Sequence, residues 1–391
     1  MSFINSVLSA FRRELLYLRS DRLYLSAITL LPIVMIAFFV VMFGGGTIEG
    51  LPIVVVDRDE SEMSRKLTNM VNATRGITVQ YEALSMDEAE GYLLDGSAVA
   101  IIYIENGFES KIYEGVPANI ESYISGASIS ASGVVESNVQ QALRTFSAGV
   151  SLGKLQAMGV NYNQAMVDIM PINFHIFILS NPYINYAYYL APIFMFMGVV
   201  IFTVLATVFA VGRELYYATA PEWIQSASGS YFAALIGKLL PITFAMILLM
   251  QLVYGILFII MGMECMGSYL MLTLASILFI IAYQSIAAVF VIITSNMRLA
   301  LSLGGGYAVM AFTFSGITFP TESMYGVART LSHLFPLTPF SDLFIDQAMR
   351  GIPVEWSVWE MAELILFMLP VAFVWPRLRR VATDRKYFSR D

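Results

Sequence analysis

The stretch Leu23–Ile48 reads LYLSAITLLPIVMIAFFVVMFGGGTI and contains no aspartate, glutamate, lysine or arginine. A helix needs ~20 consecutive, mostly apolar residues to cross the hydrocarbon core of a bilayer. It also satisfies every polar group of its own backbone, which the interior of a membrane requires. This stretch is long enough to cross with room to tilt, so it predicts a transmembrane helix close to the N-terminus.

Uncharged stretches of the same kind fill the second half of the chain. The whole chain is 58% hydrophobic and 13% charged, whereas soluble domains have roughly 45–50% and 25%. We therefore predict a mainly α-helical, polytopic membrane protein with six transmembrane helices, the first at 23–48 and the other five within 186–376. The later spans are predicted from the stretches Ile169–Gly212, Leu239–Met263, Cys265–Met297, Leu299–Thr321 and the shorter Trp356–Trp375.

Between the first two predicted spans lies an acidic insert, residues 49–185, with 16 acidic and 7 basic residues. Its apolar runs alternate with polar helical segments, a pattern typical of βαβ units on one sheet. Ser85 and Glu88 have the spacing of a capping box that starts a helix, and the chain after Ser125 is helical and leads back toward the membrane. We therefore predict an inserted extracytoplasmic α/β domain. Its strands are predicted at Leu51–Val56, Ile77–Tyr81, Ala98–Ile104 and Ala118–Ile124.

Basic residues gather at both ends of the chain. Residues 1–22 fit either an N-terminal interfacial helix, lying on the membrane surface, or an ordinary juxtamembrane anchor. Residues 377–391 form a basic tail. Because lysine and arginine near span ends mark the cytoplasmic side, we predict that both termini and residues 213–238 are cytoplasmic. The insert and an outer re-entrant region, 315–355, are then on the opposite side.

Acidic and basic residues are absent from the first five predicted spans. A charge inside a span is costly and is usually retained for ion coupling, so a self-sufficient channel or secondary carrier is disfavoured. His333 has no second candidate ligand nearby, which argues against a metal site. The net charge of −7 argues against nucleic acid as a partner. Gly44–Gly46 lacks the lysine that a phosphate-binding Walker loop needs.

The segment Arg213–Lys238 joins the second and third predicted spans and combines charged with aromatic residues. Glu214, Glu222 and Trp223 would suit docking into the groove of a partner at the cytoplasmic surface. An interfacial loop whose aromatic side chains sit at the level of the lipid head groups has the same composition. Both interpretations stay open on the residues alone.

Several short motifs follow one another in this segment and downstream of it. They are Arg213-Glu214, Thr219, Glu222-Trp223, Gly237-Lys238, FSGITFP at 314–320, Ser323-Met324, LFPLTP at 334–339 and Arg350-Gly351. Their order and spacing resemble the ABC-2 type transporter permeases, and the layout is similar to a subgroup with a large domain between the first two spans. Ala218 stands where that pattern usually has glycine, Pro221 interrupts it, and Tyr325 replaces a proline.

The resemblance implies the permease subunit of an ABC exporter, which has no ATPase motifs or cofactor of its own. ATP and Mg²⁺ would bind to a separate ABC ATPase subunit, which would drive a hydrophobic or amphipathic substrate outward. A second permease copy or a sister permease would complete the transporter, in contact with the lipid of the bacterial cytoplasmic membrane. The alternative is a membrane-anchored receptor or assembly factor that acts through its extracytoplasmic domain. The resemblance also implies ATPase-coupling roles for Arg213, Glu214, Thr219, Glu222, Trp223 and Lys238.

Overall fold

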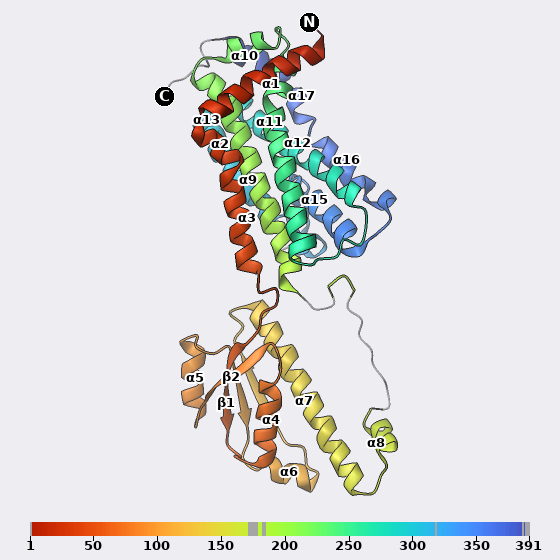
Figure 1. Cartoon of the computed structure of the whole chain (residues 1–391). Coiled ribbons are helices and arrows are strands. Elements are labelled where there is room, and N and C mark those ends of the chain that lie inside the picture. Colours follow the sequence, from red (N-terminus) through yellow and green to blue (C-terminus); the bar gives the residue numbers. More distant parts are fainter. Residues whose placement is uncertain (1, 171–178, 182–184, 317–318, 385–386, 388–391) are drawn as a thin grey trace. The chain divides into compact units, whose positions relative to one another are not determined.

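The computed structural model describes residues 2–170, 179–181, 185–316, 319–384 and 387. The chain forms two compact units (Figure 1), one made of Met1–Gly46 with Ile178–Asp391 and the other of Thr47–Phe177. The first unit is helical, and the second combines a sheet with helices. Three of the predicted segments lie partly outside the described residues. They are the segment that leads from the insert to the second span, the FSGITFP motif and the basic tail.

The α/β unit is built on a four-stranded sheet in the order β2-β1-β3-β4. β1 pairs in parallel with β2 and with β3, where Ile53 lies opposite Ala100, and β4 pairs antiparallel to β3. The strands are β1 (Leu51–Asp57), β2 (Ile77–Glu82), β3 (Ala100–Ile104) and β4 (Ile120–Ile124). The four predicted strands are confirmed to within two residues at each end. Their apolar runs are continuous in β1 and β3 because helices cover both faces of the sheet there.

α4 and α7 pack on one face of this sheet and α5 packs on the other. The helices of the unit are α4 (Glu62–Asn72), α5 (Met86–Leu94), α6 (Phe108–Glu114), α7 (Ile129–Ala157) and α8 (Tyr162–Ile169). The capping box of α5 differs from the prediction in one contact. Ser85 accepts a hydrogen bond from the N–H of Glu88, as expected, but the Glu88 carboxylate accepts from the N–H of Leu84 instead of that of Ser85.

Asp59, just after β1, holds the start of α6. Its carboxylate accepts hydrogen bonds from the N–H groups of Gly107, Phe108 and Glu109 at 2.8, 3.0 and 3.0 Å. Desolvation opposes the charged form, but these bonds and one from Ser61 outweigh it and hold the pKa of Asp59 below its ordinary value. A charged carboxylate is also favoured by the dipole of a helix N-terminus. α6 is thereby tied to the sheet.

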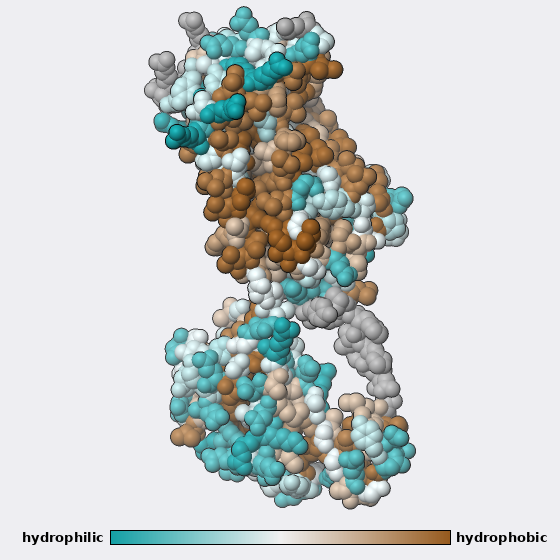
Figure 2. All heavy atoms as spheres, viewed as in Figure 1, coloured by the Kyte–Doolittle hydropathy of each residue, from teal (hydrophilic) through white to brown (hydrophobic). Residues whose placement is uncertain are grey.

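The helical unit contains, within the described residues, five helices that are long and apolar enough to cross a membrane: Arg22–Phe43, Ala187–Tyr216, Tyr231–Ile260, Tyr269–Thr294 and Val354–Phe373. They consist of α2 (Arg22–Ile28) with α3 (Leu30–Phe43), α9 (Tyr186–Tyr216), α11 (Tyr231–Gly255) with a π-helical turn, α12 (Tyr269–Thr294), and α16 (Val358–Leu366) with α17 (Pro370–Phe373). Hydrophobic residues cover the middle of this unit in Figure 2, as a lipid-facing surface requires.

The uncharged stretches differ in their bounds from the helices that they contain. The second, Ile169–Gly212, contains most of α9, which begins at Tyr186, because the Asn181 side chain bonds to the backbone N–H and carbonyl of Asn185 and the Asn185 side chain caps the helix. The fifth corresponds to α13, Met297–Thr313, whose 17 residues span about 26 Å. That is slightly less than the ~30 Å of a hydrocarbon core.

The region after α13 folds into short helices, α14 (Gly326–Ser332) and α15 (Leu337–Phe344), and α15 is enclosed by the bundle. The ring of Phe340 stacks on Phe279 of α12 at 4.1 Å and meets Phe196 of α9 at 5.1 Å. The predicted LFPLTP motif therefore starts a buried helix. Gly351 follows it with a φ of +63°, and a Cβ there would lie 2.8 Å from the Met266 carbonyl oxygen, so only glycine fits.

Three amphipathic helices gather at one end of the helical unit: α1 (Phe3–Ser20), α10 (Ala220–Ser226) and α18 (Trp375–Thr383). α10 packs against both of the others, and Figure 1 shows α1 and α10 together at that end. Arg377 donates to the carbonyl groups of Ile292 and Ile293 at 2.9 and 2.6 Å, a favourable place for a cation because these carbonyls end α12. Part of the predicted basic tail is therefore a packed helix, with Leu378 and Val381 buried.

Candidate functional site

α10 is a short helix held between the ends of α9 and α11. Thr219 directly precedes it and Pro221 lies in its first turn, where the N–H that proline lacks would have no helical partner. Ala218 has a φ of +58°, in the left-handed region that favours glycine. The proline therefore fits the start of this helix. A glycine would suit the turn better than Ala218, because glycine adopts a positive φ without strain.

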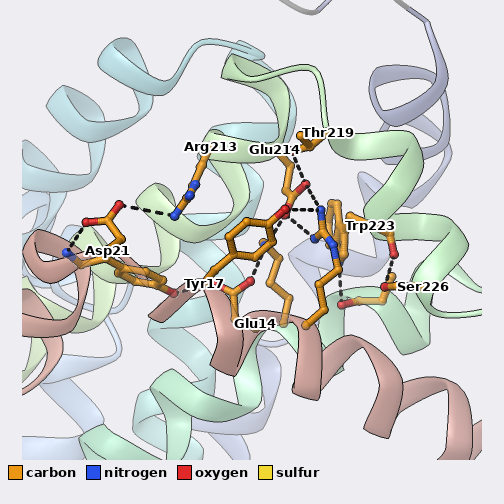
Figure 3. Close-up of polar contacts among 12 residues, drawn as sticks. Glu14, Tyr17, Asp21, Arg213, Glu214, Thr219, Trp223 and Ser226 are labelled. Atoms are coloured by element: carbon orange, nitrogen blue, oxygen red, sulfur yellow. Dashed lines mark hydrogen bonds and ion pairs between the residues drawn. The ribbon is translucent and has the colours of Figure 1, made fainter. Parts of the chain in front are cut away.

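Glu214, near the end of α9, is the centre of a buried charge network (Figure 3). Arg13 of α1 donates to both of its carboxylate oxygens, at 2.6 and 3.0 Å. Lys238 of α11 donates at 2.7 Å and the Thr219 hydroxyl at 2.6 Å. Burial alone would lower the pKa of Arg13, but the hydrogen bond and charge of Glu214 raise it. One carboxylate thus connects α1, α9, α11 and the start of α10.

Lys238 joins this carboxylate to a second one. Its Nζ donates to Glu14 at 2.5 Å, and Glu14 also accepts from the Tyr24 hydroxyl at 2.9 Å. The exposed fractions are 2% for Glu14, 1% for Glu214 and 1% for Lys238. With Arg13, the network holds two acids and two bases and is neutral overall. Ion pairing of this kind offsets the desolvation of each group, and removing one partner leaves a buried charge uncompensated.

Gly237 lets α1 approach α11 closely enough for these contacts. A Cβ at this position would lie 2.5 Å from the Val7 carbonyl oxygen and 2.6 Å from the Ala10 Cβ. Real Cβ atoms do not come so close, so the crossing of the two helices depends on glycine here. Glu14 lies one turn after Ala10 and Lys238 directly follows Gly237, which brings the two charged side chains together.

Trp223 attaches α10 to α11. Its ring is 1% exposed, its Nε1 donates to the Ala234 carbonyl at 3.0 Å, and the Lys238 Nζ lies 5.4 Å from the ring centroid. The expectation that this ring projects into the groove of a partner is wrong, because the ring already fills the space between the two helices. Glu214 and Lys238 are buried in the same way and have no face left for a partner.

The other predicted residues differ in position. The Arg213 guanidinium lies over the Tyr17 ring at 4.6 Å, with its Nη1 3.4 Å from the Asp21 carboxylate. It therefore lies beside the network and contacts none of the four charged groups. Glu222 is exposed in the first turn of α10, and Tyr217, just before that helix, is 59% exposed. These two side chains are free to meet another protein.

Arg13, Glu14 and Tyr24 belong to the site and were not predicted. The sequence does contain a signal, because Glu14 interrupts the apolar face of the helix within residues 1–22. An acid on a face that packs against another helix needs a cation as partner. Which cation that is could not be read from the chain, since Lys238 is 224 residues away.

Residues 22–375 match a family described as ABC-2 family transporter protein. The chain belongs to the ABC-2 transporter family. The resemblance to the ABC-2 type permeases is thereby confirmed at the level of the family, and the chain is a multi-pass membrane protein with a permease role in an ABC transporter. No match was found among curated proteins or among solved structures. Arg13 and Glu14 lie before the matched residues, so half of the charge network is outside them.

In this ABC-2 protein the contacts of the site hold helices together. Among the described residues, no group of three or more histidine, cysteine or acidic side chains could hold a metal ion. α10 is fastened by Thr219 to α9 and by Trp223 to α11. Any displacement of α10 must therefore move these helices with it or break buried hydrogen bonds.

Proposed function

We propose that this ABC-2 protein is the permease subunit of an ATP-driven exporter that moves a hydrophobic or amphipathic substrate outward. A separate ABC ATPase docks on α10, with ATP and Mg²⁺ on that subunit, and a second copy or a sister permease completes the transporter. One observation carries the proposal: α10 packs against four other helices, α1, α9, α11 and α18, while Glu222 of α10 and the nearby Tyr217 are exposed. A partner that moves α10 therefore moves transmembrane helices.

Six membrane crossings fit this function, with both termini in the bacterial cytoplasm. α1, α10 and α18 share one end of the unit, which calls for an even number of crossings. α13 supplies the sixth crossing. Met297, at the start of α13, packs against Gly212 near one end of α9. At the other end of α13, the Phe314 carbonyl accepts a hydrogen bond from Thr338. The basic residues of α1 and α18 support a cytoplasmic location of that end.

Cysteine labelling in intact cells tests this topology. We replace Cys265 with alanine and introduce either Ser97→Cys in the α/β unit or Gln225→Cys in α10. A membrane-impermeant maleimide should label the first variant and reach the second only after the cells are permeabilised. The reverse pattern would overturn the orientation, and labelling of both in intact cells would contradict separate sides.

Binding of the ATPase tests the docking surface. Tyr217→Ala should weaken the association by at least ~2 kcal/mol, roughly thirtyfold, because exposed tyrosines are typical anchors of interfaces. Glu222→Gln should have a smaller effect, since charges at the rim of an interface contribute little to affinity. The affinity-tagged chain is purified from native membranes, the co-purifying ABC ATPase is quantified by mass spectrometry, and its turnover is measured in nanodiscs.

Tyr325→Ala is the matched control, because Tyr325 is 84% exposed and precedes α14, away from α10. It should leave ATPase binding unchanged. Full association of the Tyr217→Ala, Glu222→Gln double variant would remove α10 as the docking element. Failure to recover any ATPase with the wild-type chain would count against ATP-driven export itself.

A further inference from the structure

A groove of about 510 Å³ opens on the α/β unit between α4, α6 and α7, within the roughly 300–1,000 Å³ of small-molecule sites. Its floor is the core of the unit. Phe146 lies there, 6% exposed and stacked on Phe108 at 5.9 Å, and Met63, Met70 and Ile112 pack against the same core. The apolar interior therefore reaches the surface in this groove.

Two glycines of α7 keep the groove open. Gly149 and Gly153 are one turn apart and both line the groove. Apart from the adjoining residues and the backbone of α7 itself, no described atom lies within 4 Å of where a Cβ of either would stand. Glycine destabilises the interior of a helix relative to alanine. No close packing within the described chain requires a glycine at either position. What their missing side chains provide is space over the apolar floor.

The groove is positively charged although the unit as a whole is acidic, with 16 acidic and 7 basic residues. Lys66 and Lys154 line it, and no acidic residue does. Within the described residues, neither lysine's ammonium group has a hydrogen bond or an ion pair. The other five basic side chains each have a polar partner, and these are Arg58, Arg65, Arg75, Lys111 and Arg144.

We propose that this groove binds a long-chain fatty acid. The alkyl chain lies on Phe146 in the space over Gly149 and Gly153, and the carboxylate meets the ammonium groups of Lys66 and Lys154. Methionine side chains adapt to an alkyl chain because they are unbranched and flexible, and Met63 and Met70 form one wall. A ligand with an apolar chain and a single anionic group complements both the surface and the charge. The site does not depend on an ATPase partner.

Photocrosslinking of the full-length chain in nanodiscs of zwitterionic lipid tests this proposal. The probe is palmitate with a diazirine in the middle of its chain, and adducts are mapped by mass spectrometry of peptides. We expect adducts on peptides of α4 and α7, which excess palmitate suppresses. Gly149→Leu/Gly153→Leu should reduce these adducts at least tenfold without lowering the melting temperature. Gly149→Ala/Gly153→Ala, which favours the helix, should reduce them to a smaller extent and covers the case in which the leucine variant fails to fold.

The charge requirement has its own control. Lys66→Gln/Lys154→Gln should reduce labelling by the acid but not by the corresponding diazirine alcohol, whereas Arg75→Gln/Lys111→Gln should reduce neither. Equal labelling of α4 and α7 in the wild-type and leucine variants would overturn the proposal, as would an alcohol that labels as well as the acid. A changed oligomeric state of the leucine variant, in place of lost labelling, would identify a second copy as the occupant and also overturn it.

Discussion

Lys238→Met should leave little folded protein, because Glu14 and Glu214 both lose the ammonium group that they contact. Among the described residues, Arg13 then remains as the only cation that bonds to either of these two buried carboxylates, and it bonds to Glu214. Removing one partner of a buried ion pair typically costs about 3–5 kcal/mol, which is a large part of the stability of most proteins. We expect a strongly lowered midpoint of thermal unfolding in detergent and a loss of the monodisperse peak in size-exclusion chromatography.

A charge-balanced double variant separates lost charge balance from lost packing. In Lys238→Met/Glu14→Gln the remaining pair of Arg13 and Glu214 is neutral, so much of the stability should return. Glu222→Gln, on the exposed side of α10, should change the stability by less than about 0.5 kcal/mol. If Lys238→Met unfolds at the temperature of the wild type, or the double variant is no more stable than the single one, the network does not hold these helices together.

Gly237→Leu should detach α1 from α11. A Cβ at this position already meets the backbone of α1 at 2.5 Å, so a leucine side chain must push the two helices apart. Overpacking typically costs about 1–3 kcal/mol, and the displacement also takes Glu14 away from Lys238. We expect trypsin to cleave α1 much faster, at Arg12, Arg13 and Arg19, and we expect the variant to stimulate its ATPase partner less in nanodiscs.

Gly255→Leu is the matched control in the same helix. Among the described residues, no atom beyond the adjoining residues and the backbone of α11 lies within 4 Å of where a Cβ at Gly255 would stand. It should leave both the cleavage rate of α1 and the stimulated ATPase turnover unchanged. Equal protection of α1 in the two leucine variants would show that Gly237 does not set the distance between the helices. Fast cleavage in both would point to a general loss of stability of α11.

The amino-acid sequence by itself determined the membrane unit and the sheet. An uncharged run such as Leu23–Ile48 is long enough to cross a bilayer, and a helix satisfies the polar groups of its backbone within one segment. The runs Leu51–Val56 and Ala98–Ile104 are short and continuously apolar, which favours strands that are covered on both faces. The motifs from Arg213 to Gly351 were sufficient for the family. All of these signals are local, because they depend on length, period and spacing along the chain.

Only the tertiary structure decided which side chains of the site meet and which remain exposed. Trp223 and Glu222 are neighbours in the sequence, yet the first fills the space beside α11 and the second is exposed. Glu14 and Lys238 are 224 residues apart, and their contact follows from the close crossing of two helices at Gly237. Helix packing brings such distant positions together, and no period or spacing within one segment records it.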